Sequence, residues 1–494
     1  MTGTHALFVL AAHDVGPARS QMGASLGFHI IFACFGIAFP TVLLIAHWIG
    51  LRRGDPVALL LARRWSKVMA VIFAVGAVSG TVLSYELGLL WPTLMGRFGP
   101  AYGIPFSVEA IWFFVEAIFT AIYLYGWRQL PPWVHWWTGV PLVISGVLGA
   151  LSVVAANSWM NQPSGFTLSH GKIASVDPWA VFFNPATPYE ATHMILAAYM
   201  VVGFVVAAVY AVGLMRGRND RYHRLGFLIS FGTGAVAAPI QVVFGDSVAR
   251  VIEKQQPLKF AAMEFVDRTH SHVTEWLGGI WYQGHVYFGV GIPSFDSILV
   301  GYSPNTRVIG WDTVPVKDRP PFPDVIHLAF NVMVAVGFAL VVLSAWQGWV
   351  YWFRRTIPDT RWFLIPVALS GVGAVVAMES GWIVTEVGRQ PWVVYKLLRT
   401  SDAVTTAGGV PVTLIVTLGI YAVLTGVTIF VPLLMRAGVG ATRIPSFPLV
   451  SRCPTRGRSV AQQSNQSDEH ALGVGRRRRR VVGHHGRVRT VRRR

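Results

Sequence analysis

The sequence predicts an all-α membrane protein, a polytopic bundle of about nine transmembrane helices. Hydrophobic residues make up 53% of the chain, charged residues make up 13%, and the mean hydropathy is +0.50. These values lie outside the range of a soluble domain of this length. Apolar windows of about 20 residues, long enough to cross a bilayer, recur along the chain. They are expected at 22–50, 66–90, 104–126, 136–157, 190–214, 225–245, 324–350, 362–385 and 411–436.

The topology follows from the distribution of Lys and Arg between the short loops. The loops after the first, third, fifth and seventh spans are the basic ones, so the positive-inside rule places them in the cytoplasm. The N-terminus, residues 1–21, is therefore expected outside and the C-terminus inside. The residues that carry this bias are Arg52, Arg53, Arg63, Arg64, Lys67, Arg128, Arg216, Arg218, Arg221, Arg224, Arg354, Arg355 and Arg361.

Two segments interrupt the membrane pattern. Helices one to six are expected within 22–245 and helices seven to nine within 324–438, and the segment 246–323 between them is too long to be a simple connection. We expect it to be a functional extracytoplasmic loop. The tail 439–494 holds 14 Arg against two acidic residues, and it supplies +12 of the formal charge of +18. Such a tail suits anionic lipid or nucleic acid, but we favour a disordered cytoplasmic tail without a specific nucleic-acid partner.

Carboxylates at lipid depth are the first functional signal. The run VVAMESGWIVTEVGRQPW, residues 375–392, carries Glu379 and Glu386 into an apolar helix. An ionisable side chain at the centre of a membrane helix costs at least about 2.5–3.5 kcal/mol. Such a residue marks an ion path, a proton relay or a ligand, unless it is simply a neutral, hydrogen-bonded carboxylic acid.

Four potential metal ligands fall at a similar depth. With a rise of 1.5 Å per residue, His29, His193, Met333 and Glu379 all reach the outer leaflet. The chain has only two cysteines, so a redox cofactor must use other ligands. A low-spin haem needs two axial ligands and a high-spin haem needs one. Singly, each residue could be packing or hydrogen bonding, but the set favours cofactor ligation. His327 is the strongest rival to His193.

A pair of acidic residues lies in the third span. Glu109 and Glu116 are seven residues apart, which is about two turns, so both carboxyls should project from one face roughly 10 Å apart along the axis. This spacing suits a proton relay, and the alternative is an interhelical hydrogen bond for each. A proton-coupled transporter could also use these acids together with Glu379, but it should show inverted repeats, which the sequence lacks. A haem-binding scaffold without turnover is a third reading.

Four motifs together resemble a known family. They are ESGWIVTEVGRQPW at 379–392, VEAIWFFVEAIFTAIYLYGW at 108–127, NSWMNQP at 157–163 and QQPLKFAAMEF at 255–265. The chain from Arg19 to Arg436 resembles the large haem-bearing subunit of the cytochrome bd-type quinol oxidases, of the kind with a short quinol loop. The resemblance implies an enzyme that oxidises quinol at the outer face and reduces oxygen to water at a dihaem site, generating membrane potential without proton pumping.

The resemblance also implies the setting of this enzyme. The location is the bacterial cytoplasmic membrane, crossed many times by the chain. The expected partner is a smaller membrane subunit II, with or without a small single-helix accessory subunit. The implied cofactors are two haem b and one haem d, or three haem b.

The same resemblance assigns roles to individual residues. His193 and Met333 would ligate the low-spin haem b, and His29 and Glu379 the two high-spin haems. Four further residues are assigned to protons and quinol: Glu109 and Glu116 match acids of the dihaem site and of proton delivery, and Lys259 and Glu264 match the residues of quinol oxidation.

Two positions depart from the family pattern. Asn331 stands where some members have an arginine, and Val375 stands where some have a tryptophan. The first change removes a positive charge expected to stabilise the reduced low-spin haem.

Overall fold

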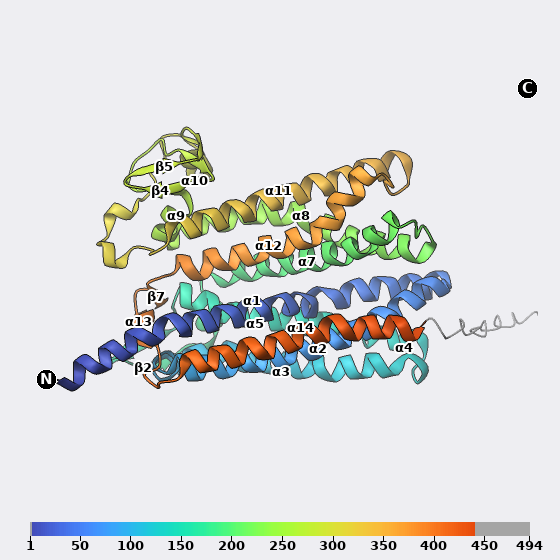
Figure 1. Ribbon diagram of the computed structural model, residues 1–494, viewed down its shortest axis with the longest axis horizontal. Helices are drawn as coiled ribbons and strands as arrows, with labels where there is room; N and C mark the ends of the chain where they lie inside the picture. Colours follow the sequence, from blue (N-terminus) through green and yellow to red (C-terminus); the bar gives the residue numbers. More distant parts are fainter. Residues whose placement is uncertain (1, 440–494) are drawn as a thin grey trace, which may run out of the picture. The chain divides into compact units, whose positions relative to one another are not determined.

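The computed structural model describes residues 2–439 and confirms the all-α membrane bundle. Within this range nine helical segments are long and apolar enough to cross a membrane, and they lie side by side in Figure 1. Residues 440–494, which hold nearly all of the predicted basic tail, lie outside the described part of the chain. The long helices are α1 (Thr2–Arg53), α2 (Pro56–Leu90), α3 (Pro92–Tyr125), α5 (Val140–Asn161), α7 (Thr187–Met215), α8 (Arg221–Gln255), α11 (Pro323–Arg354), α12 (Arg361–Gly388) and α14 (Val410–Val439).

Shorter elements connect these helices. The strands form four antiparallel pairs, β1 with β2, β3 with β6, β4 with β5 and β7 with β8. The short helices are η1 (Gly126–Arg128), α4 (Pro132–Trp137), α6 (Pro178–Phe182), α9 (Pro257–Glu264), α10 (Phe295–Gly301), η2 (Trp311–Thr313), η3 (Val316–Asp318) and α13 (Thr400–Ala403). The strands are β1 (Phe166–Ser169), β2 (Lys172–Val176), β3 (Glu275–Leu277), β4 (Ile280–Tyr282), β5 (His285–Tyr287), β6 (Val290–Ile292), β7 (Trp392–Val394) and β8 (Leu398–Arg399).

Several helices extend beyond the apolar spans that the sequence predicts. A hydropathy window detects only apolar residues, whereas a helical backbone also continues through polar residues of adequate helix propensity. For this reason α8 runs to Gln255 instead of ending near 245, and the connection to α11 is limited to 256–322. Similarly, α2 begins at Pro56, because the Asp55 side chain accepts a hydrogen bond at 3.0 Å from the backbone N–H of Val57.

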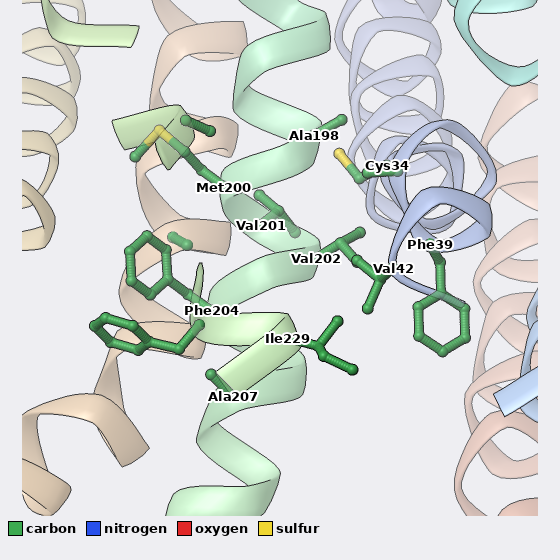
Figure 2. Close-up of a cluster of buried hydrophobic side chains, with 14 of the residues drawn as sticks. Cys34, Phe39, Val42, Ala198, Met200, Val201, Val202, Phe204, Ala207 and Ile229 are labelled. Atoms are coloured by element: carbon green, nitrogen blue, oxygen red, sulfur yellow. The ribbon is translucent and has the colours of Figure 1, made fainter. Parts of the chain in front are cut away.

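The apolar core is centred on α7, which packs against α8, α12, α1 and α5. Figure 2 shows Val202 of α7 lying beside Val42 of α1, with Ile229 of α8 below them. All three side chains are buried. The core thus fixes α1, α7 and α8 against one another and sets the level of the side chains that these helices carry.

Glycines allow α7 to approach its neighbours closely. A Cβ added at Gly203 would lie 2.4 Å from the backbone nitrogen of Gly234 on α8. A Cβ at Gly371 of α12 would lie 2.9 Å from Cα of Val205. Small residues at such crossings let helix backbones meet, which is the usual way in which membrane helices gain packing energy.

The polar connection between α8 and α11 is bound to the first turns of α11. The backbone N–H of Gly278 donates to Oδ1 of Asn331 at 3.0 Å, and that of Trp281 donates to Oδ1 of Asp324 at 2.6 Å. The short helix α9 packs against α8, α11 and α12. Asn331, one of the two positions that depart from the pattern of the family that the chain resembles, therefore holds this connection in place.

The close contact at Gly203 gives a stability prediction. Gly203→Ala should lower the melting temperature of the purified complex, because overpacking a helix crossing costs about 1–3 kcal/mol. Gly232→Ala on α8 is the matched control, because a Cβ there meets nothing within 4 Å. Equal melting temperatures for the two variants, followed by thermal unfolding in detergent, would contradict the proposed role of the crossing.

Candidate functional site

His193 presents a free nitrogen inside the bundle. It lies near the N-terminal end of α7, and its Nδ1 is buried without a hydrogen-bond partner among the described residues. Its Nε2 lies 3.2 Å from Nε2 of Gln241 on α8. A Cβ added at Gly245 would lie only 3.2 Å from Cε1 of the ring, so this glycine provides the space that the imidazole occupies.

Met333 of α11 lies near α12, and Glu379 of α12 faces a different neighbour. A Cβ at Gly381, two residues from Glu379, would lie 3.0 Å from Sδ of Met333. The Oε1 atom of Glu379 is buried without a hydrogen-bond partner in the described chain. Its Oε2 faces α1, where a Cβ at Gly27 would lie 3.3 Å away. A buried, unpartnered carboxylate oxygen is costly, and a metal ion is one group that would satisfy it.

His29 is held in the form that binds metals. The Ser79 hydroxyl donates to the backbone carbonyl of Gly76 at 3.0 Å, so it accepts a hydrogen bond from Nδ1–H of His29 at 2.9 Å. This tautomer leaves Nε2 unprotonated, with its lone pair free. A Cβ at Gly80 would lie 2.9 Å from Cε1 of the imidazole. As with His193 and Met333, the ring lies against a glycine of the neighbouring helix.

Interhelical contacts bring the four predicted ligands to one level of the bundle. Gly27 is two residues from His29 on α1 and faces Glu379, and Gly381 on α12 faces Met333. At the same level Nε1 of Trp382 donates to Sδ of Met194, the residue that follows His193. The role of His29, Glu379, Met333 and His193 as ligands stays a prediction.

Both ring nitrogens of His327, the rival ligand, have hydrogen-bonding neighbours. Its Nδ1 lies 2.5 Å from the carbonyl oxygen of Met263, and its Nε2 lies 3.1 Å from that of Gly278. The ring stacks on Phe265 with centroids 3.9 Å apart. In the neutral ring Nδ1–H donates to the Met263 carbonyl and Nε2 accepts from Nδ2 of Asn331 at 3.2 Å. Both nitrogens are therefore engaged, which favours His193 as the residue available to a metal.

The two acids of α3 lie on one helix face. Glu116 points at α1, where a Cβ at Gly36 would lie 3.1 Å from its Oε1. Glu109 lies two turns before Glu116 on the same helix and is half-buried. Neither carboxylate forms an ion pair within the described residues. This leaves both of them free to exchange protons.

A buried ionic network, which the sequence did not reveal, joins α5 to α12. Arg389 donates to Oε2 of Glu386, and Nδ2 of Asn157 donates to Oε1 of the same carboxylate at 2.5 Å. The Arg389 side chain is 3% exposed, and its Nε and Nη1 have no partner in the described chain. Two free guanidinium N–H groups in a buried position fit an anionic group such as a haem propionate.

The network continues to the predicted quinol residue Lys259. Its Nζ donates to Oδ1 of Asn161 at 3.0 Å, and Nδ2 of Asn161 donates to Oε1 of Glu190 at 3.1 Å. Burial lowers the pKa of the Lys259 ammonium, and the nearby Glu190 carboxylate opposes this shift. The motifs NSWMNQP and GRQPW were visible in the sequence, but only the fold shows that they form one network.

Lys259 and Glu264 are not the surface charges of an exposed helix. Both lie on α9 and each is 3% exposed. They point in different directions, because five residues correspond to about 140° around a helix. Lys259 lies against α12, where a Cβ at Gly388 would lie 2.7 Å from its Cγ. Glu264 instead faces Glu275, which lies on β3.

The fold and site define a class of protein. A membrane bundle that holds His, Met and carboxylate donors at one level, next to a buried arginine with free N–H groups, is built to hold haem. The free Nδ1 of His193, the free Oε1 of Glu379 and the glycines opposite the donors fit that group.

Comparisons with known proteins identify the family. The family described as cytochrome bd terminal oxidase subunit I matches residues 17–438. A putative cytochrome bd menaquinol oxidase subunit I from Bacillus subtilis is 35% identical over 427 residues, which are 85% of this chain and 95% of the relative. A cytochrome bd ubiquinol oxidase subunit 1 from the same organism is 26% identical over 429 residues, with 84% and 91% covered.

A solved structure agrees. The bd oxidase from Geobacillus thermodenitrificans matches with a TM-score of 0.80 and 33% identity, covering 86% of this chain and 98% of that one. The chain belongs to the cytochrome bd terminal oxidase subunit I family. It is thus a multi-pass membrane subunit of a haem-containing quinol oxidase that works together with a subunit II, and the transporter reading has no support.

The contrast between the two histidines gives a spectroscopic prediction. His193→Ala should abolish the low-spin haem signal in the reduced-minus-oxidised spectrum of the purified complex, because it removes one axial ligand. His327→Ala is the control and should retain that signal, because the nitrogens of His327 are engaged by the Met263 carbonyl and the Asn331 side chain. The assignment is wrong if His193→Ala leaves the spectrum unchanged and His327→Ala removes the signal.

Proposed function

We propose that this subunit oxidises quinol on the outer side of the membrane and reduces oxygen to water at a dihaem site within the bundle. The observation that carries the proposal is the convergence of His29, His193, Met333 and Glu379 at one level, each with its donor atom opposite a glycine or without a partner. The membrane potential would come from taking the protons for oxygen reduction from the cytoplasm while quinol protons leave outside, without pumping.

The proposed ligand roles follow from the chemistry of the donors. His193 and Met333 would hold the low-spin haem b as an axial pair. His29 and Glu379 would each hold one high-spin haem, since a carboxylate oxygen is a weak-field ligand. Bound haem would supply one-electron transfer and oxygen binding, and we propose two haem b with one haem d, or three haem b. Arg389 would neutralise a propionate, and Ser79 would keep His29 in its ligating tautomer.

Lys259 and Glu264 would make the quinol site on α9. Lys259 can donate to a quinol oxygen, and its buried ammonium is balanced by Glu190 through Asn161. Glu264 can accept a quinol proton. Both residues lie in the connection between α8 and α11, which is the quinol loop predicted at 246–323.

Glu116 and Glu109 would deliver protons towards the dihaem site. Their two-turn spacing on α3 places one carboxyl above the other, and Glu116 lies against α1, the helix that carries His29. A carboxyl in such a position can receive a proton from the cytoplasmic side and pass it outward.

The proposed orientation puts the N-terminus outside and the C-terminus in the cytoplasm of a bacterial cell. The basic loop residues at the opposite end of the bundle from α9 support it. Besides subunit II, a small single-helix accessory subunit is part of the proposed complex. The smaller subunit and the lipid would cover the apolar side chains exposed on the outer helices, such as Ile111, Val243 and Leu369.

The quinol site can be tested by separating the two half-reactions. Lys259→Ala and Glu264→Ala should each slow quinol-dependent oxygen consumption by about tenfold or more, the effect of losing a hydrogen bond to a charged group worth about 1.5–3 kcal/mol. Oxygen consumption with an artificial donor that bypasses the site should survive, and it serves as the internal control. Full quinol turnover in both variants would count against this site.

Ligand and proton roles can be told apart among the buried acids. Glu379→Ala should remove or disturb a high-spin haem in the optical spectrum. Glu116→Gln keeps shape and hydrogen bonding but cannot carry a proton, so it should retain haem and slow turnover by about a hundredfold. Glu109→Gln, measured in the same assays, should affect both the haem spectrum and the turnover rate. If Glu116→Gln keeps the full oxygen-reduction rate and full potential generation, the proton route lies elsewhere.

A further inference from the structure

Three carboxylates converge in the segment between α8 and α11. They are Glu264 at the end of α9, Glu275 on β3 and Asp296 in the first turn of α10. One oxygen from each lies within 4.8 Å of the others. Their exposed fractions are 3%, 8% and 0%, so the cluster is buried although it lies outside the spanning helices.

No cation within the described chain pairs with these three side chains. Both carboxylate oxygens of Asp296, and one oxygen each of Glu264 and Glu275, are buried without a hydrogen-bond partner there. Three unpaired negative charges in such a site would cost several kcal/mol each. One oxygen of Glu264 lies within 4.8 Å of one oxygen of Glu275, so the two carboxyls can share a hydrogen bond when one of them is protonated. The cluster therefore holds protons.

The surrounding charged groups are engaged elsewhere or acidic, apart from Lys254 of α8, which is exposed and whose charge acts on Glu253. The neighbouring helix α8 contributes Glu253, a fourth carboxylate whose charge acts on Asp296. The other charged or titratable groups on the elements packed around the cluster are Arg250, paired with Asp246; Lys259, bound to Asn161; His272, bound to Ser294; His327, bound to Met263 and Asn331; Asp312, bound to Thr269; and Asp324, bound to the backbone of Trp281.

Burial sets the proton affinity of the cluster. It raises the pKa of Glu264 well above the usual range, and the charges of Glu275 and Asp296 raise it further. Burial likewise raises the pKa of Glu275 to about 7 and that of Asp296 to about 8. A base with a pKa near the working pH is the most effective in proton transfer.

We propose that Glu264, Glu275 and Asp296 form the proton-release relay of quinol oxidation, an inference that rests on the quinol site proposed above. A quinol hydroxyl gives its proton to the ionised Glu264 carboxylate while its electron leaves to the oxidase. That proton crosses the Glu264–Glu275 hydrogen bond, and Glu275, the most exposed of the three, releases a proton to the outer water. Two such cycles convert one quinol to quinone, two protons and two electrons.

Asp296 acts in this relay as a positioning residue. Its unpartnered carboxyl lies beside the Glu264–Glu275 pair, and when it is ionised its negative charge raises the proton affinity of Glu264. Because the pair accepts a proton only when ionised, quinol oxidation should rise with pH through the pKa of the pair. Removing the Asp296 charge lowers that pKa, so the acidic limb of the pH profile should move to lower pH.

The experiment measures quinol oxidation by the purified complex as a function of pH for Glu275→Gln, Asp296→Asn and Glu264→Gln. Asp267→Asn is the matched control, an acid of the same segment that lies outside the cluster and beside Arg268. Glu275→Gln should lower kcat about tenfold or more with little change in KM. Asp296→Asn should shift the acidic limb by at least about half a pH unit. Turnover with the artificial donor should stay at the wild-type level.

Each outcome decides between the hypotheses. Unchanged kcat and pH profiles for Glu275→Gln and Asp296→Asn, with Glu264→Gln impaired, would overturn the relay and leave the quinol site standing. Unimpaired Glu264→Gln would instead overturn the quinol site itself. Loss of quinol turnover on chelation and its recovery with Ca²⁺, in the wild type but not in Asp296→Asn, would show a cation site and also overturn the relay.

Discussion

The ion pair between Arg389 and Glu386 is the interaction on which the end of the bundle next to α9 depends. A buried pair of this kind is stable only when further hydrogen bonds satisfy both partners, and Asn157 of α5 supplies one of them. From there Asn161, one turn on, reaches Glu190 of α7 and Lys259 of α9. Four separate elements are therefore held by one set of polar contacts at the end of α12.

The position of α12 explains why the proposed haem ligands and the proposed quinol residues share one end of the bundle. This helix packs on α7 and α11 through its middle and on α9 through its end. Glu379 and Gly381 lie on the stretch between these contacts. The same helix therefore positions Glu379 against α1 and Gly381 against Met333. Its last residue, Gly388, lies against Lys259 of α9.

Sequence reasoning found the long helices because each depends on a single stretch of chain, and hydropathy located the nine spans. The rise per residue predicted a common depth for His29, His193, Met333 and Glu379, and their role as ligands stays a prediction. Helix ends were missed where polar residues continue the helix, as in α8 up to Gln255. Hydropathy carries no information about propensity at those positions.

Contacts between distant segments could not be predicted in this way. The engagement of both nitrogens of His327 involves the Met263 carbonyl and the Asn331 side chain, and no side-chain pattern reports the first of these. The cluster of Glu264, Glu275 and Asp296 joins residues from a helix end, a strand and a loop helix. Their proximity follows from how the connection folds back on α11, so it became visible only with the structure.

The glycines that face the donors also constrain how this protein can evolve. Gly27, Gly80, Gly245 and Gly381 have no functional group, yet any side chain there would displace a carboxylate, an imidazole or a thioether. Most single-base changes in a glycine codon introduce a larger residue. Selection against such changes should therefore preserve these four positions as strictly as the ligands themselves, and a lineage that loses one of the donors should be free to replace its glycine as well.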